Sequence, residues 1–183
     1  MESRKRQPWF ALKVRTRGEL LVSSALQSKT FETFVPTWKE FRRYTDRVKT
    51  IDAAMFPGYL FCRLDPLRPL RALETLGVAY IIGADGCFVP VPDEEITALQ
   101  RLMAFERAAK PWPYLRKGAK VRVEFGALAG VEGWLIAEKG IDRLVLSVEI
   151  LQRSVAVEID REWIRPMPVI PAADGALQSI GTK

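Results

Sequence analysis

Because its 183 residues include no histidine, acid–base chemistry in this chain would need carboxylates, lysine, tyrosine or cysteine, and none of these is clustered in a recognisable catalytic motif. Two groups have the spacing of paired acids: Asp93, Glu94 and Glu95, and Glu158 with Asp160. A positioned pair of carboxyl groups can act as general acid and base. However, the first group falls where a predicted helix begins and favours negative charge, and the second falls at the end of a predicted strand. We assign both groups to structure, expect no catalytic residues, and do not expect an enzyme.

The two cysteines, Cys62 and Cys87, lie far apart and lack the Cys-x-x-Cys spacing of a metal site. We expect two reduced thiols, no metal and no cofactor, since the chain also has no glycine-rich loop that could hold a phosphate. It has no run of eighteen apolar residues, and the basic start, residues 1–6, leads into a predicted strand rather than an apolar signal segment. The sequence therefore predicts a cytoplasmic protein with no membrane partner.

Basic residues outnumber acidic ones, 28 to 22, which gives a formal net charge of +6. A positive surface attracts phosphates, but a moderate excess also serves solubility, and the two interpretations are equally favoured here. Arg15 and Arg17 share one turn. A second group lies in residues 38–54, which read as a projecting hairpin that is either an inert ribbon or a nucleic-acid contact; its basic residues are Lys39, Arg42, Arg43, Arg47 and Lys49.

Hydrophobic periodicity predicts an α+β N-terminal domain over residues 7–106, with one antiparallel sheet flanked by helices. The predicted strands are 9–14, 32–37, 56–64, 78–83 and 87–91, besides the hairpin. A helix over 19–29 presents Leu21, Val22, Ala25 and Leu26. A second opens at Asp65, buries Leu70, Leu73 and Leu76, and stops at Gly77. A third has Asp93 as its N-cap and buries Ile96, Leu99, Leu102 and Met103.

The pattern changes after residue 106. Residues 107–116 contain two prolines and read as a stiff linker, and residues 117–166 read as a small all-β barrel. The last residues, 167–183, are small and polar, and we expect a disordered tail. The barrel strands are predicted at 119–124, 131–138, 143–149, 153–159 and 162–165.

Residues 56–64 carry three aromatic residues and two leucines around one Pro-Gly. Strand alternation puts Phe56, Leu60 and Cys62 on one face and Tyr59 and Phe61 on the other, so both faces are apolar. From these residues alone, a central strand buried on both faces is the favoured interpretation.

Phe56-Pro57-Gly58-Tyr59-Leu60-Phe61 resembles the signature of the NusG family of transcription elongation factors, as do residues 9–14. The pattern from Val121 to Gly133, with glycines at 126, 130 and 133, is similar to the family's KOW motif. The resemblance implies an N-terminal NusG domain, a KOW barrel, and an apolar cavity that grips two clamp helices of RNA polymerase. The residues to which it assigns this polymerase contact are Phe56, Pro57, Tyr59, Phe61 and Ile81.

The resemblance also implies a nucleic-acid contact and a partner-binding loop. Arg15, Arg17 and Arg71 would contact the non-template DNA of the transcription bubble. The partner-binding residues would be Ile150, Leu151 and Arg153, in a loop that resembles the Ile-Phe-Gly-Arg loop by which the general factor engages Rho or a small-subunit ribosomal protein. Here Leu151 replaces the aromatic residue and Gln152 the glycine, so we expect ribosomal-protein binding to persist and Rho binding to weaken.

Two choices stay open at this stage. Within the family, the chain is either the general factor or an operon-specific paralogue of the RfaH type; residues 70–73 differ from the His-Thr-Thr-Thr run with which RfaH-like members contact a second part of polymerase. The alternative to a transcription factor of this family is a ribosome-associated or RNA-binding KOW protein. The β-rich alternation of residues 117–166 favours a stable barrel over a fold-switching one, and we expect a monomer.

Overall fold

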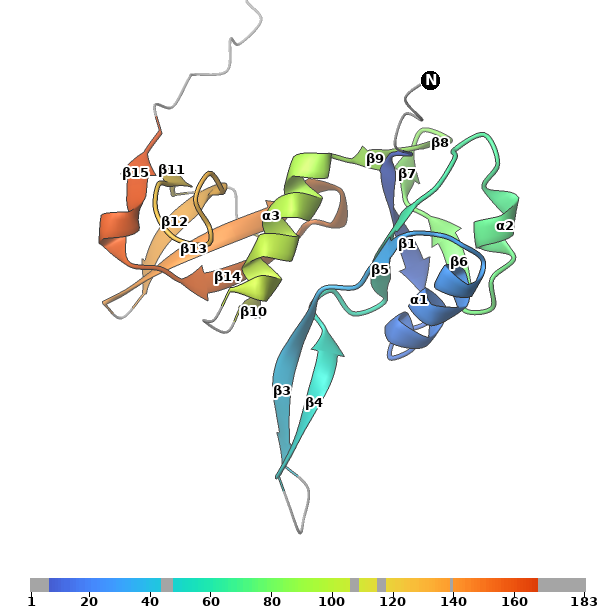
Figure 1. Cartoon of the computed structure of the whole chain (residues 1–183), viewed down its shortest axis with the longest axis horizontal. Coiled ribbons are helices and arrows are strands. Elements are labelled where there is room, and N and C mark those ends of the chain that lie inside the picture. Colours follow the sequence, from blue (N-terminus) through green and yellow to red (C-terminus); the bar gives the residue numbers. More distant parts are fainter. Residues whose placement is uncertain (1–6, 44–47, 106–108, 115–117, 139, 168–183) are drawn as a thin grey trace, which may run out of the picture.

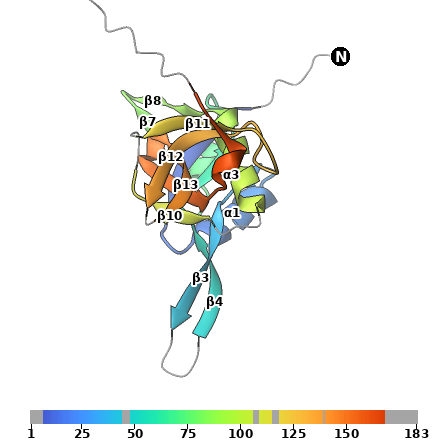
Figure 2. The same ribbon diagram turned by 90° about the vertical axis from the view of Figure 1, so that its left-hand side faces the viewer.

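The computed structural model describes residues 7–43, 48–105, 109–114, 118–138 and 140–167. These residues form two antiparallel sheets, with one helix, α3, between them and a two-stranded ribbon that stands away from both (Figures 1 and 2). The expected disordered tail lies, apart from Met167, outside the described residues. No helix in the described ranges is long and apolar enough to cross a membrane.

The first sheet has the strand order β2-β5-β1-β6, with β9 also paired to β1. Its central strand β1 pairs with β5 so that Ala11 lies opposite Phe61 and Leu12 opposite Leu60. A small hairpin, β7–β8, follows β6. The bounds of these strands are β1 Trp9–Val14, β2 Thr33–Phe34, β5 Tyr59–Arg63, β6 Val78–Ile81, β7 Gly83–Ala84, β8 Cys87–Phe88 and β9 Pro90–Val91.

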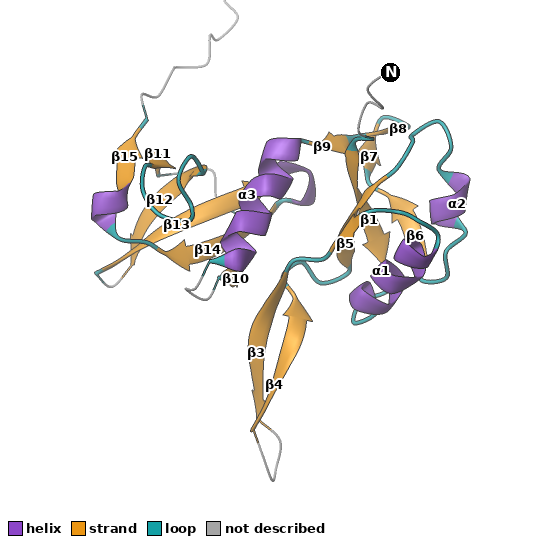
Figure 3. Cartoon of the chain, viewed as in Figure 1, coloured by secondary structure: helices purple, strands orange, loops and turns teal. Residues whose placement is uncertain are grey.

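Helices α1 (Glu19–Ser28) and α2 (Leu70–Leu73) lie together at the first sheet, and α3 (Asp93–Ala104) lies beside the second (Figure 3). Val22 and Leu26 of α1 are buried, as predicted, but Leu21 is exposed. The prediction for the second helix was wrong: only four residues are helical, Ala72 is the buried position, and Leu70 and Leu76 face solvent, Leu76 being 93% exposed. Asp93 is not the N-cap either, since Pro92 takes that position.

Strands β3 (Thr37–Arg43) and β4 (Val48–Ala54) form the projecting hairpin that the sequence predicts, with seven residue pairs from Thr37↔Ala54 to Arg43↔Val48. Its tip, residues 44–47 with Arg47, lies outside the described residues.

The second sheet has six strands in the order β10-β14-β13-β12-β11-β15. Its end strands β10 and β15 do not pair with each other among the described residues, so the path is open and a closed barrel is not seen. Lys110–Trp112, within the expected linker, form edge strand β10 on β14. The bounds are β10 Lys110–Trp112, β11 Ala119–Val123, β12 Glu132–Glu138, β13 Ile141–Val148, β14 Arg153–Glu158 and β15 Ile164–Pro166, with short 3₁₀ turns η1 Glu149–Leu151 and η2 Arg161–Trp163.

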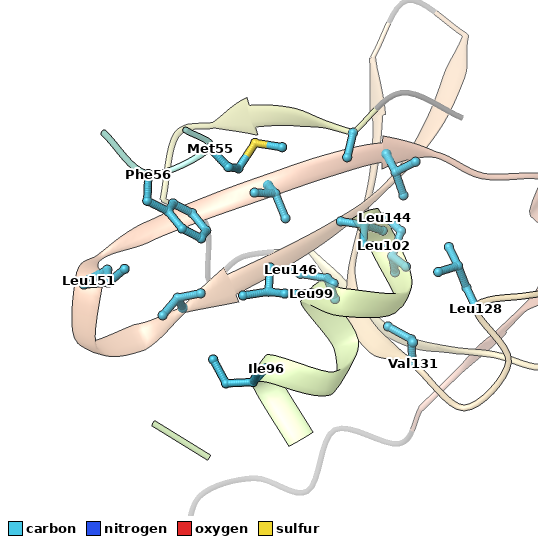
Figure 4. Close-up of a cluster of buried hydrophobic side chains, with 14 of the residues drawn as sticks. Met55, Phe56, Ile96, Leu99, Leu102, Leu128, Val131, Leu144, Leu146 and Leu151 are labelled. Atoms are coloured by element: carbon cyan, nitrogen blue, oxygen red, sulfur yellow. The ribbon is translucent and has the colours of Figure 1, made fainter. Parts of the chain in front are cut away.

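Two buried apolar clusters hold the molecule together. The smaller joins one face of the first sheet, through residues such as Leu12 and Leu60, to α1 and α2. The larger starts on the opposite face, at Phe56 and Phe61, and continues through α3 into the second sheet (Figure 4). Because burial of apolar area is the main force in folding, this shared cluster fixes the second sheet over one face of the first.

Candidate functional site

The Pro57-Gly58 turn sets the geometry of the aromatic strand. Proline cannot donate to a ladder, and Gly58 has a φ of +83°, a conformation that favours glycine. The turn is held from both sides, since the Gly58 carbonyl accepts from the Val14 N–H at 2.9 Å and the Gly58 N–H donates to the buried Glu19 carboxylate, Oε1, at 2.6 Å. Strand β5 therefore begins at Tyr59 rather than Phe56.

This turn brings Phe56 onto the same side of the sheet as Phe61, against the alternation expected from the sequence. The two rings meet edge to face with centroids 6.1 Å apart, and Phe34 stacks on Phe61 at 6.1 Å. We call Phe34, Phe56 and Phe61 the aromatic cluster. Phe56 and Phe61 are 1% and 0% exposed, Tyr59 is half-buried, and Pro57 is exposed. The buried-strand interpretation from the residues alone is thus correct for Phe61 in this arrangement.

Much of the cover over the aromatic cluster comes from α3 and the second sheet. Ile96 and Leu99 of α3, and Leu151 at the turn between β13 and β14, belong to the same buried cluster as Phe56 and Phe61 (Figure 4). The guanidinium of Arg153 lies 5.8 Å from the centroid of the Tyr59 ring, and the ammonium of Lys13 lies 4.2 Å from the same centroid. The aromatic strand is therefore covered by α3, which directly follows the first sheet, and by the turn between β13 and β14, more than fifty residues further along the chain.

Ile81, the fifth residue predicted to line the polymerase cavity, is on the other face. It lies opposite Leu12 in the β1–β6 pair and is buried in the smaller cluster with α1 and α2. Residues directly opposite each other in a sheet share a face, so Ile81 points to the same side as Leu12. The next residue along the strand points to the other side. Its neighbour Ile82 packs against the larger cluster instead.

The three predicted DNA-contacting arginines fall at two places. Arg15 and Arg17 are exposed in the turn before α1, where Arg17 has a φ of +67° and the Arg15 N–H donates to the Gly77 carbonyl. Arg71 is exposed at the other end of α1: its guanidinium donates to the Lys29 carbonyl at 3.3 Å and lies 5.9 Å from the Phe31 ring centroid. A ten-residue helix is about 15 Å long, so Arg71 does not sit beside the other two.

The predicted partner-binding loop faces the first sheet rather than solvent. Leu151 is 8% exposed, Ile150 is half-buried against the larger cluster, and only Arg153 is exposed while lying over Tyr59. Gln152 occupies the left-handed region, with φ 49°, where the resembling loop has glycine. The two surfaces predicted to bind different partners therefore cover each other.

A cavity of ≈ 950 Å³ lies between α3 and strands β12 and β13. Glu95 lines it, and burial, with the adjacent Glu94 charge second, raises the pKa of its carboxyl above the ordinary value. Glu132 lines it too, but hydrogen bonding from Arg122 lowers the pKa of that carboxyl. Arg101 ties the helix to the second sheet by donating to the Ala129 carbonyl at 2.8 Å. The described residues contain no group of His, Cys, Asp or Glu that could hold a metal ion.

Sequence reasoning missed two residues that position the site. Glu19 reads as an ordinary acid in the first turn of a helix, yet it is 5% exposed and holds Gly58. Arg63 reads as a strand residue, yet it is buried over the Trp9 ring, donates to the Gln7 carbonyl at 2.6 Å and pairs with Asp93 at 2.7 Å. Its link to Asp93 ties β5 to the start of α3. Both charged residues are unusual because they are buried, and burial of a single charged residue cannot be predicted from the local sequence.

The family model described as "Transcription termination factor nusG" matches residues 7–100, just over half of the chain. The chain belongs to the NusG family. This family assignment confirms the resemblance carried by residues 9–14 and 56–61. The choice between the general factor and an RfaH-type paralogue stays a prediction. No curated protein matches the chain significantly.

Among solved structures, a structure describing the domain interaction in Thermotoga maritima NusG has 16% sequence identity, a TM-score of 0.52, and a match over 89% of this chain and 98% of that one. At that identity the likeness shows that this NusG-family chain shares the fold. A structure of the MjSpt4:Spt5 complex, conformation A, is matched at 13% identity over 87% of this chain and 97% of that one, with a TM-score of 0.29.

Proposed function

We propose that this NusG-family chain is a transcription elongation and antitermination factor that binds the clamp helices of RNA polymerase through Phe56, Pro57, Tyr59 and Phe61. The observation that carries the proposal is the cover over Phe56, Tyr59 and Phe61: α3 and a sheet beyond the first domain pack against them. If that sheet moves away, an apolar aromatic surface is exposed, and such surfaces are typical protein-binding sites. Ile81 has no place in this surface, and Ile82 takes its position.

We call the arrangement in which the second sheet lies over the aromatic strand the closed arrangement. It couples the two proposed sites. Polymerase binding at the aromatic face requires η1 to leave it, and that departure frees Ile150, Leu151 and Arg153 for a second partner. A protein whose binding-competent form is a fraction of the total has its apparent affinity reduced by that fraction. The first ligand therefore removes the cost of opening for the second, and either partner raises the affinity of the other.

The function needs binding energy and no chemistry. A factor with higher affinity for the closed, elongating clamp than for the paused one shifts that equilibrium towards elongation by the difference in binding free energy. Arg15 and Arg17, exposed on one turn, would contact the phosphates of the non-template strand; Arg71 would make a separate contact from the far end of α1. Such a factor works in the cytoplasm, as a monomer.

The second sheet would recruit the second partner. In this proposal residues 7–106 act as the polymerase-binding domain and residues 117–166 as a KOW domain. Ile150 and Arg153 match the resembling loop, so we expect the freed loop to bind a small-subunit ribosomal protein. Leu151 and Gln152 lack the aromatic area and the backbone freedom of that loop, so we expect weak binding to Rho, as an antiterminator requires.

Capture by purified RNA polymerase tests the proposal. Immobilised full-length chain should retain polymerase, and adding it to a transcription reaction should shorten pauses. Arg15→Glu with Arg17→Glu should keep capture but flatten the salt dependence of binding to a transcription bubble. No capture in the presence of a saturating ribosomal partner, which should open the chain, would refute the polymerase assignment and favour a ribosome-associated KOW protein.

A further inference from the structure

Two cations from different parts of the chain lie against one aromatic ring. The Lys13 ammonium, on β1, is 4.2 Å from the centroid of the Tyr59 ring, and the Arg153 guanidinium, on β14, is 5.8 Å from it. In the described part of the chain, no carboxylate forms an ion pair with either cation. Like charges held this close repel each other, and salt screens half-buried groups only partly. The closed arrangement therefore brings two uncompensated positive charges together.

A hydroxyl group lies beside the same ammonium. The position that a Cβ atom would occupy on Gly58 is 2.6 Å from Lys13 Nζ and 3.1 Å from Thr16 Oγ1. Any larger residue at position 58 would displace these two groups, and glycine leaves the space between them open. An ammonium and a hydroxyl, both hydrogen-bond donors, therefore border one small space next to the Tyr59 ring.

The charge around this space is positive. The carboxylate of Glu19 is buried below the turn, where its Oε1 accepts from the Gly58 N–H at 2.6 Å. Against this one negative charge stand the two cations at the Tyr59 ring and the exposed side chains of Arg15 and Arg17 in the adjoining turn. A small anion is thus attracted to this place by four positive charges and repelled by one.

We propose that the closed arrangement binds a small phosphate-type anion between Lys13 and Thr16 of the first domain and Arg153 of the second sheet. An ammonium, a hydroxyl and a guanidinium are the donors that phosphate oxygens prefer. The anion replaces the repulsion between the two cations by two attractions. Lys13 is half-buried, so the space admits a free phosphate group, whereas a nucleic-acid strand meets the exposed Arg15 and Arg17 from outside.

The anion is a regulator of the closed arrangement. Lys13 and Arg153 belong to different sheets, so an open chain does not offer the complete set of donors. A ligand that prefers one of two states shifts the population towards that state by its difference in affinity. The anion therefore keeps the aromatic strand covered and weakens polymerase binding, and polymerase weakens anion binding to the same extent. The effect on polymerase rests on the proposed function, whereas anion binding does not.

Isothermal titration calorimetry of the full-length protein with inorganic phosphate and inorganic pyrophosphate, at constant ionic strength, tests the site. Wild type should bind a single anion. Lys13→Met and Arg153→Met keep an unbranched side chain but lose the cation, so each should weaken binding roughly tenfold or more. Lys110→Met is the matched control, because it removes the same charge from an exposed lysine on β10 and should leave the anion affinity unchanged.

The proposal would be overturned if neither anion bound, or if Lys110→Met weakened binding as much as the other two variants. Loss of binding in folded Lys13→Met but not in Arg153→Met would contradict a site shared by the two sheets. Single-stranded DNA whose binding needs both cations, with no pyrophosphate binding, would contradict a small ligand.

Polymerase capture distinguishes this proposal from the proposed function. Saturating phosphate should reduce capture of polymerase by wild type and have less effect on capture by Arg153→Met. A chain that binds the anion through both cations but captures no polymerase would refute the proposed function and leave the anion site standing. Capture that is equally strong with and without the bound anion would refute the regulatory role.

Discussion

Leu151→Ala should open the closed arrangement and make the chain a tighter polymerase binder. Leu151 is 8% exposed at η1 and belongs to the buried cluster that contains Phe56 and Phe61. Burying a leucine side chain contributes roughly 1.5–3 kcal/mol, so truncation should weaken the closed form by about 2 kcal/mol. Since about 1.4 kcal/mol corresponds to a tenfold change, the ratio of closed to open molecules should fall about thirtyfold.

Two measurements follow this change. Small-angle X-ray scattering should give a larger radius of gyration for the variant, and titration with RNA polymerase should give an apparent dissociation constant lower by up to about thirtyfold, the limit set by the closing equilibrium. Phe125→Ala removes an exposed aromatic ring from the turn that follows β11 and should change neither the radius of gyration nor the affinity for polymerase. Thermal unfolding followed by circular dichroism checks that the variant is open rather than unfolded.

The reasoning would be refuted if folded Leu151→Ala bound polymerase no better than wild type while its radius of gyration rose. The aromatic face would then be open without being a polymerase site. Weaker binding at an unchanged radius would place Leu151 itself in the contact and contradict its role as a cover.

Four further predictions follow. Phe61→Ala, which removes a fully buried ring, should lower the free energy of unfolding by about 3–5 kcal/mol in chemical denaturation; a loss below 1 kcal/mol would mean that the ring is not core. Glu19→Ala leaves the Gly58 N–H without its acceptor and should cost about 1–3 kcal/mol of stability, whereas Glu19→Gln should restore much of it; equal effects of the two changes would exclude the hydrogen bond as the cause. In native protein a thiol reagent should modify only the exposed Cys87, because burial, with the Glu32 charge second, raises the pKa of the Cys62 thiol to about 12. In denaturant, Cys62 should react as well. Rapid reaction of both thiols in native protein would contradict the burial of Cys62. The pKa of the Glu95 carboxyl is raised in the folded protein, so its contribution to stability falls as pH rises from about 4.5 through that raised pKa. Glu95→Gln should therefore stabilise the protein at neutral pH and lose this advantage in acid. Identical dependence of the free energy of unfolding on pH in Glu95→Gln and wild type would show that Glu95 is solvated.

The strands of the second sheet could be predicted from the sequence because their alternation is local. Residues 153–159 and 119–124 were expected as strands, and β14 and β11 end within a residue of those limits. The same alternation failed at Phe56, because the Pro57-Gly58 turn breaks the period of two before β5 begins. A local sequence pattern can predict a strand. A turn within the pattern, however, changes the face on which the following side chains lie.

The α2 region shows a different limit. Leucines at 70, 73 and 76 have helical spacing, but Pro69 precedes the helix, only four residues are helical, and Ala72 is the side chain that fits the core. Spacing alone did not show how little of the segment could be buried. The Ile81 assignment failed for a related reason, since the register of β6 on β1 sets its face and is fixed by pairing across the chain.

The mutual cover of the two predicted sites could not be derived from sequence. Residues 56–61 and 150–153 are about ninety positions apart, and nothing in either motif indicates the other. The contact of Arg153 with the Tyr59 ring and the shared cluster depend on how two folded sheets pack. Long-range packing of this kind is decided by surfaces that exist only once each part has folded.

The affinity of Tyr59→Ala for RNA polymerase tests the central claim most directly. Tyr59 is the half-buried member of the aromatic strand, so its loss leaves the aromatic cluster in place and isolates binding from folding. Titration of polymerase with full-length protein labelled at exposed Cys87 should show a loss of about 2 kcal/mol of binding free energy, or about thirtyfold, if Tyr59 is a hot spot. A Tyr59→Ala protein that is folded and binds polymerase as tightly as wild type would contradict the account.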